Sequence, residues 1–152
     1  EAIGRLPWEI LILLGGGFAL AMGMMNSGLS QWVGEQLSFL SVVPLPLMLL
    51  GIALVITFLT EVTSNTATTQ VMLPVLAAVA AVSGMDVTQV LLVATLAASC
   101  AFMLPVATPP NALIFGTERA TMSAMMKVGI RLNIIMPLVL VALVMVLRDL
   151  MP

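Results

Sequence analysis

The chain has 152 residues, of which 61% are hydrophobic and 8% are charged, and its formal net charge is −2 at pH 7. A soluble domain carries about 25% charged residues, so this composition indicates an integral membrane protein. One cysteine and no histidine exclude a disulfide framework, a zinc site and histidine-based acid/base catalysis. The first apolar stretch follows no basic region or cleavage site, so we expect a membrane span and a chain that is part of a longer protein.

Two helices are expected at the start of the chain, one apolar and one amphipathic. Residues 8–25 are mostly apolar and predict a first span, because a helix needs roughly 20 apolar residues to cross the hydrocarbon. Residues 29–40 place apolar side chains at helical spacing among polar ones. Trp32 suits the headgroup layer, so this second helix is expected to lie along the membrane surface as an amphipathic connector.

The most polar stretch of the chain, residues 60–69, lies between the apolar segments 44–62 and 71–82. Two interpretations compete: two complete spans joined by an external loop, or a re-entrant hairpin whose tip lies inside the membrane. The second arm, residues 67–82, is short for a crossing of about 20 residues. The tip also lacks the Lys, Arg or Asp of an aqueous loop, and non-helical backbone is tolerated at depth where it lines a cavity. Both observations favour the hairpin.

Prolines interrupt the next apolar helix, which is expected to run from Asp86 to Leu104 and to resume at Asn111. Each proline lacks a backbone donor and disfavours the helical conformation of the residue before it. An ordinary loop between two spans is the alternative, but residues 111–117 make only a stub, so a discontinuous helix fits better. The last span is expected over about residues 128–147, with a kink at its proline.

The positive charges predict an orientation. In the expected topology four of the five Lys and Arg side chains fall on one side of the membrane, namely Arg5, Arg119, Lys127 and Arg131, and Arg148 falls on the other. By the positive-inside rule the 119–131 loop is cytoplasmic, and the hairpin enters from outside.

Helix ends inside a membrane can bind ions, because unpaired N–H groups favour anions and unpaired carbonyls favour cations. The N–H and hydroxyl of Thr66, with the Asn65 amide, are therefore expected to hold a carboxylate. The carbonyls of Thr60, Thr63 and Ala107 are expected to be available to Na⁺. Since no Lys or Arg lies in this region, a bound dianion would have to be neutralised by cations and helix dipoles.

These residues belong to motifs that resemble the divalent anion/sodium symporter family, the INDY-type dicarboxylate transporters. The resemblance covers essentially the whole chain and rests on Leu6–Gly17, Phe58–Ala67, Ala98–Ala112 and Met126–Gly129. It implies the C-terminal part of an all-α membrane protein built as an inverted repeat. The missing N-terminal repeat would supply the other half of the binding site, and the full protein would be a homodimer.

The resemblance also divides the chain. Residues 1–43 would hold the last scaffold helix and the amphipathic arm helix, and residues 44–152 would hold part of the transport domain. That part would comprise the outer re-entrant hairpin 44–82, the broken helix 87–117 and the final helix 122–148.

The family's binding motifs can be transferred residue by residue. The substrate would be bound by the Ser-Asn-Thr motif and by the Thr-Pro step of the broken helix, that is by Ser64, Asn65, Thr66, Thr108 and Pro109. The sodium ion would be bound by Thr60, Thr63, Asn65 and Ala107, with Thr63 lending only its carbonyl. For Glu61 a structural hydrogen-bonding role is favoured over a role in tuning cation binding.

The resemblance therefore implies sodium-coupled symport of di- or tricarboxylates, with succinate-like C4 dicarboxylates as the expected substrates and citrate or sulfate as alternatives. The multi-pass protein would lie in the inner or plasma membrane and shift its transport domain against a scaffold, in an elevator-type movement. A sodium-independent exchanger of the same fold and a non-transporting structural subunit or fragment are the alternatives. An intramembrane hydrolase is remote because no nucleophile–base pair is visible. No cofactor besides the coupling Na⁺ and no nucleic-acid partner are expected.

Overall fold

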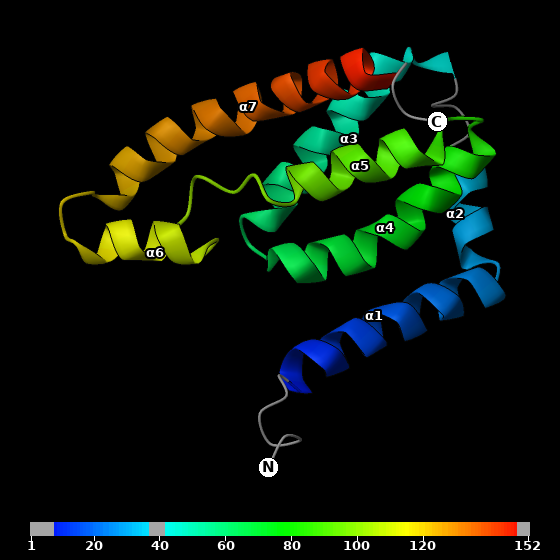
Figure 1. Cartoon of the computed structure of the whole chain (residues 1–152), viewed down its shortest axis with the longest axis horizontal. Coiled ribbons are helices and arrows are strands. Elements are labelled where there is room, and N and C mark those ends of the chain that lie inside the picture. The colour runs from blue at the N-terminus through cyan, green and yellow to red at the C-terminus, as the bar shows by residue number, and fades with distance from the viewer. Residues whose placement is uncertain (1–7, 37–41, 149–152) are drawn as a thin grey trace.

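The computed structural model describes residues 8–36 and 42–148, and within these ranges the regular structure is helical, with no β-strand. The helices are α1 (Trp8–Asn26), α2 (Leu29–Gln36), α3 (Leu45–Thr60), α4 (Asn65–Val82), α5 (Val87–Ala97), α6 (Pro109–Gly116) and α7 (Met122–Leu147) (Figure 1). The C-terminal end of the amphipathic helix expected over residues 29–40 lies outside the described residues.

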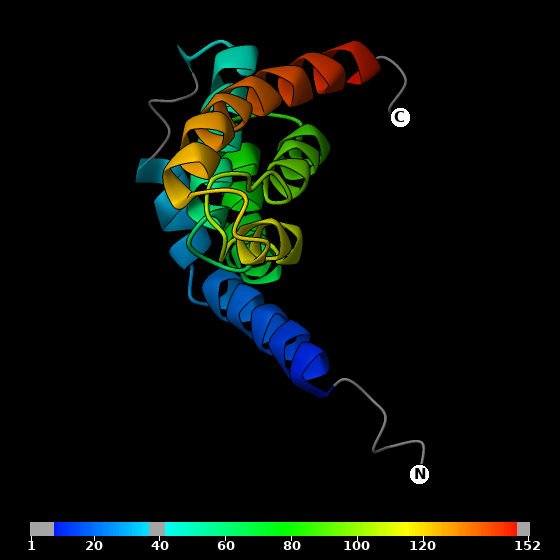
Figure 2. The same cartoon turned by 90° about the vertical axis from the view of Figure 1, so that its left-hand side faces the viewer.

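Four helices, α3, α4, α5 and α7, share one apolar core. Its fully buried members include Leu49 of α3, Val93 of α5 and Val144 of α7, and Ala80 completes it from α4. Small residues are frequent in this core, which lets the helix backbones approach closely. The helices α1 and α2 contact α4, and in both views α1 lies on the far side of α4 from α7 (Figure 1 and Figure 2). The four packed helices hold the α3–α4 turn against the segment that joins α5 to α6.

Polar side chains define where several helices begin. The Ser64 hydroxyl accepts a hydrogen bond from the N–H of Ala67 at 3.0 Å, and the Asp86 carboxylate accepts one from the N–H of Thr88 at 2.8 Å. These are N-cap interactions, which satisfy donors that the first turn leaves unpaired. Thr108 caps α6 in the same way, and prolines at its first two positions lose no hydrogen bond there. For this reason α6 begins at Pro109, two residues before the predicted start at Asn111.

The end of α5 corrects the sequence prediction. This helix ends at Ala97, whereas the apolar pattern predicted a helix as far as Leu104. The N–H groups of Phe102 and Leu104 donate to the Glu61 carboxylate rather than to helical carbonyls. The helix is therefore broken before the first proline is reached, because a side chain from the α3–α4 turn takes up its backbone donors.

Among the described residues, α7 is the one helix long and apolar enough to cross a membrane by itself. It continues through Pro137, which lies on its buried face. The opposite face exposes apolar side chains such as Ile130, Ile134 and Leu138. The apolar helices α3 and α5 are shorter than a full crossing requires.

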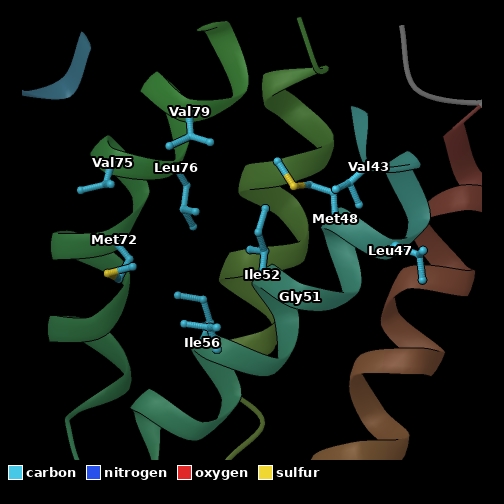
Figure 3. A pocket seen from close by; sticks show the side chains of 11 residues that line it. Val43, Leu47, Met48, Gly51, Ile52, Ile56, Met72, Val75, Leu76 and Val79 are labelled. Atoms are coloured by element: carbon cyan, nitrogen blue, oxygen red, sulfur yellow. The ribbon is translucent and has the colours of Figure 1, made fainter. Parts of the chain in front are cut away.

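A wholly apolar groove runs between α3 and α4 on the side away from the polar turn (Figure 3). It has a volume of about 330 Å³. Its lining consists of aliphatic and methionine side chains and one glycine: Val43, Leu47, Met48, Gly51, Ile52, Val55, Ile56, Met72, Val75, Leu76 and Val79. Nothing in this groove could bind a charged ligand.

Candidate functional site

The turn between α3 and α4 carries the polar motif. Ser64 caps α4, and the N–H groups of Asn65 and Thr66, in the first turn, have no hydrogen-bond acceptor among the described residues. Such N–H groups, with the positive end of the helix dipole, attract anions. The turn therefore presents two unused donors at the start of α4.

A second cavity, of about 600 Å³, opens beside this turn. Its lining is partly polar, in contrast to the groove between α3 and α4. All five residues predicted to bind the substrate line it: Ser64, Asn65, Thr66, Thr108 and Pro109. Two of the four residues predicted to bind sodium, Asn65 and Ala107, also line it, whereas Thr60 and Thr63 do not. The N-terminal residues of two helices, α4 and α6, thus meet at one cavity, and their dipoles both favour a negatively charged ligand there.

Thr60 lies behind Asn65 and is fully buried. Its hydroxyl oxygen is 2.6 Å from Asn65 Oδ1 and 2.9 Å from the carbonyl oxygen of Ala98. Three oxygens therefore gather around a single hydroxyl proton, which can be donated to only one of them at a time. A group of uncharged oxygens of this kind is suited to a hard cation such as Na⁺.

Thr63 is placed differently from the other predicted sodium ligands. It is exposed, and its hydroxyl bonds to the Leu59 carbonyl at 2.8 Å and to the Thr68 hydroxyl. Its side chain thus braces the turn, and only its carbonyl is available for an ion. The carbonyl oxygens of Thr60, Thr63 and Ala107 accept no hydrogen bond from any residue in the described ranges.

Glu61 has the structural role that the sequence favoured. Its carboxylate is 3% exposed and accepts hydrogen bonds from the N–H groups of Phe102 at 2.7 Å, Met103 at 2.8 Å and Leu104 at 2.9 Å. The Asn133 side chain of α7 donates a further hydrogen bond at 2.6 Å. All four donors are neutral, and together they use both carboxylate oxygens. Glu61 therefore joins the turn to the broken helix and to α7.

Sequence reasoning missed several residues around the site. Asn111 lines the cavity, and its side-chain amide donates to the carbonyls of Ala101 and Leu104, each at 3.0 Å. Ser99 also lines the cavity. Asn133 could have been singled out by one signal, since an amide in the middle of an apolar helix is costly unless it has a partner.

Comparison with known proteins places these observations in a family. The family described as "Sodium:sulfate symporter transmembrane region" matches residues 3–151. The chain is 44% identical over 144 residues to the "Sodium-dependent dicarboxylate transporter SdcS" of Staphylococcus saprophyticus, covering 95% of this chain and 28% of that protein. It is 50% identical over 131 residues to "Solute carrier family 13 member 2" of Mus musculus, covering 86% of this chain and 22% of that protein. The chain thus spans between 22% and 28% of the length of these relatives.

Proposed function

Because the chain belongs to the sodium:sulfate symporter family of membrane proteins, we propose that it is the C-terminal part of a transporter that moves a dicarboxylate together with sodium. The relatives are transporters and not enzymes, and one of them is named a sodium-dependent dicarboxylate transporter. The observation that carries the proposal is the cavity at which the first turns of α4 and α6 meet.

One carboxylate of the substrate binds at this cavity. Asn65 and Thr66 offer unpaired N–H groups, and Thr66 adds a hydroxyl. None of the described residues that line the cavity is Lys or Arg, so the positive ends of two helices and a bound cation must balance the negative charge. The same cavity is also lined by Ser64, Thr108 and Pro109.

A sodium ion binds next to this carboxylate. Its ligands are oxygens of Thr60, Thr63, Asn65 and Ala107, and Thr60, Thr63 and Ala107 offer carbonyls that accept no hydrogen bond in the described ranges. The Thr60 hydroxyl donates a hydrogen bond to Asn65 Oδ1 at 2.6 Å, so two of the four proposed ligand residues are direct neighbours. Asn65 serves both ligands, so the binding of the anion depends on the binding of the cation.

The α3–α4 unit is a re-entrant hairpin in this proposal. Figure 1 supports it: the α6–α7 loop lies at one end of the long axis, the α4–α5 turn and the end of α7 lie at the other, and the α3–α4 turn lies between them. The 119–131 loop would then be cytoplasmic. Residues 44–152 form part of a transport domain that moves against the scaffold containing residues 1–43, in a multi-pass homodimer whose N-terminal repeat completes the site.

The test uses the full-length protein that contains this chain, reconstituted in proteoliposomes. Succinate uptake driven by an inward sodium gradient is expected, and Asn65→Ala should weaken the apparent affinities for both sodium and succinate. Thr95→Ala is the matched control, because this exposed threonine bonds only within its own helix, to the Leu91 carbonyl. Uptake that needs no sodium would favour an exchanger. Unaltered affinities in Asn65→Ala would refute the assignment of the site.

A further inference from the structure

The residues that bind the two ligands come from separate segments, and a group outside the cavity sets their spacing. Asn65 belongs to the α3–α4 turn, whereas Ala107 and Thr108 follow the non-helical stretch between α5 and α6. This stretch is held through the backbone N–H groups of Phe102–Leu104. Leu104, the last of them, lies three residues before Ala107. The main partner there is Glu61, four residues before Asn65.

The carboxylate of Glu61 is suited to this task because it only accepts hydrogen bonds. Oε1 accepts from the N–H groups of Phe102 and Met103 and from the Asn133 amide, and Oε2 accepts from the N–H of Leu104. A glutamine would turn one of these oxygens into an NH₂ group facing a backbone donor. A carboxylate occupied in this way by four neutral donors is not positioned as a sodium ligand.

Helix α7 also contacts the Phe102–Leu104 stretch through Gly129, which lies one helical turn before Asn133. A β-carbon added there would overlap the Phe102 carbonyl oxygen and would lie 2.5 Å from Met103 Cα. Only a glycine lets α7 approach the backbone this closely. Gly129 and Asn133 lie four residues apart and therefore share one face of the helix, so α7 holds the stretch from one side and reaches Glu61 with the same face.

Asn133 is a costly choice for packing alone. It is fully buried, and its Oδ1 has no hydrogen-bond partner among the described residues. Exchanging the positions of Oδ1 and Nδ2 by rotating the amide would not satisfy Oδ1, because Oδ1 would then face the Glu61 carboxylate. An unpaired buried acceptor is destabilising, and an apolar side chain of similar volume would avoid it. The position therefore depends on the hydrogen bond that Asn133 donates to Glu61.

We infer that Glu61, Gly129 and Asn133 form a positioning clamp, which sets the distance between Asn65 and Ala107 and so determines the affinity for sodium. The inference rests on the proposed function and deepens it. The three residues do not touch either ligand; they act through the backbone of Phe102–Leu104. The final helix α7 is thereby part of the ion-binding machinery and moves together with the hairpin tip and the broken helix.

The decisive variant is Asn133→Leu in the full-length protein, which keeps the volume and removes the donor. The sodium concentration for half-maximal succinate uptake should rise about tenfold, which is the loss expected for one hydrogen bond to a charged group. Maximal uptake at saturating sodium should be largely retained. The rise in melting temperature that sodium produces at a fixed concentration should shrink.

Thr57→Val is the matched control. Thr57 is equally buried, and its hydroxyl bonds to the Ala97 carbonyl of α5, outside the clamp. This variant should lower the melting temperature without changing the half-maximal sodium concentration. If Asn133→Leu behaves like Thr57→Val, the clamp is merely structural and the inference is wrong.

A conservative variant covers the case in which Asn133→Leu does not fold. Asn133→Gln keeps an amide donor on a longer side chain, so its sodium affinity should fall between those of the wild type and a donor-free variant. A sodium affinity no better than that of the smaller, donor-free Asn133→Ala variant would overturn the inference. Failure of the proposed function is distinguishable, because it would appear in the wild-type protein as succinate uptake that does not respond to sodium.

Discussion

The apolar groove between α3 and α4 and the cavity at the α3–α4 turn differ in the polarity of the groups that line them. The groove toward the base of the pair is lined only by apolar side chains and glycine, whereas the cavity at the turn is lined by hydroxyls, amides and the first turns of two helices. Helix α4 contributes to both, with α3 as its partner in the groove and α6 as its partner at the cavity. Groups suited to binding ions are thus exposed where helices begin and end, because only helix ends leave backbone groups unpaired.

The largest effect is expected from Glu61→Gln, which disrupts the hydrogen bonds that hold the residues beside the cavity in place. The new NH₂ group faces at least one buried N–H, and a buried donor left without an acceptor costs about 1–3 kcal/mol. We expect a strongly lowered melting temperature in detergent and nearly complete loss of sodium-driven uptake. Glu118→Gln in the exposed α6–α7 loop is the control and should be neutral. A Glu61→Gln protein as stable and active as the wild type would contradict the geometry.

An effect of similar size, but confined to substrate affinity, is expected from Thr66→Ala, which changes the cavity itself. Losing one hydrogen bond to a substrate carboxylate costs about 1.5–3 kcal/mol, or roughly ten- to a hundredfold in substrate affinity. Equilibrium binding of succinate in saturating sodium measures this loss. Ser83→Ala, at the opposite end of α4, removes a hydroxyl without a partner among the described residues and should leave affinity unchanged. Equal affinities in both variants would remove Thr66 from the site.

Gly129→Ala tests whether close approach of α7 is needed. The added methyl would overlap the Phe102 carbonyl, and overpacking of this kind costs about 1–3 kcal/mol. Gly51→Ala is the matched glycine in the apolar groove, where an added β-carbon meets no atom within 4 Å. It should be neutral or stabilising by up to about 1 kcal/mol, because alanine is the better helix former. The two melting temperatures should therefore move in different directions; a parallel shift would argue against the close contact.

The smallest effect is expected in the groove. Val75→Ala removes part of a half-buried side chain and should cost at most about 1 kcal/mol of stability. Sodium and substrate affinities should be unchanged, since the groove holds no group that could contact either ion. A changed sodium dependence in this variant would show that the groove and the cavity are coupled.

Much of the helical order follows from the sequence alone. The apolar segment 44–62 contains α3, and the short arm predicted over residues 67–82 corresponds to α4, which begins slightly earlier because Ser64 caps it. These features are local: they depend on runs of apolar residues and on a capping side chain a few positions away. The residues expected to bind the substrate were also named from the sequence, through a resemblance to a family, and their roles stay predictions.

Only the tertiary structure decided how the site is supported. The hydrogen bonds of Glu61 reach residues 41 to 72 positions away in the chain, and they end α5 at Ala97 instead of Leu104. Close contact between Gly129 and Phe102, and the approach of Ala98 to Thr60, are likewise invisible in a local pattern. Apolar periodicity reports which face of a helix is buried, but it does not report which distant backbone donor a buried carboxylate will find. That choice is made when the helices pack.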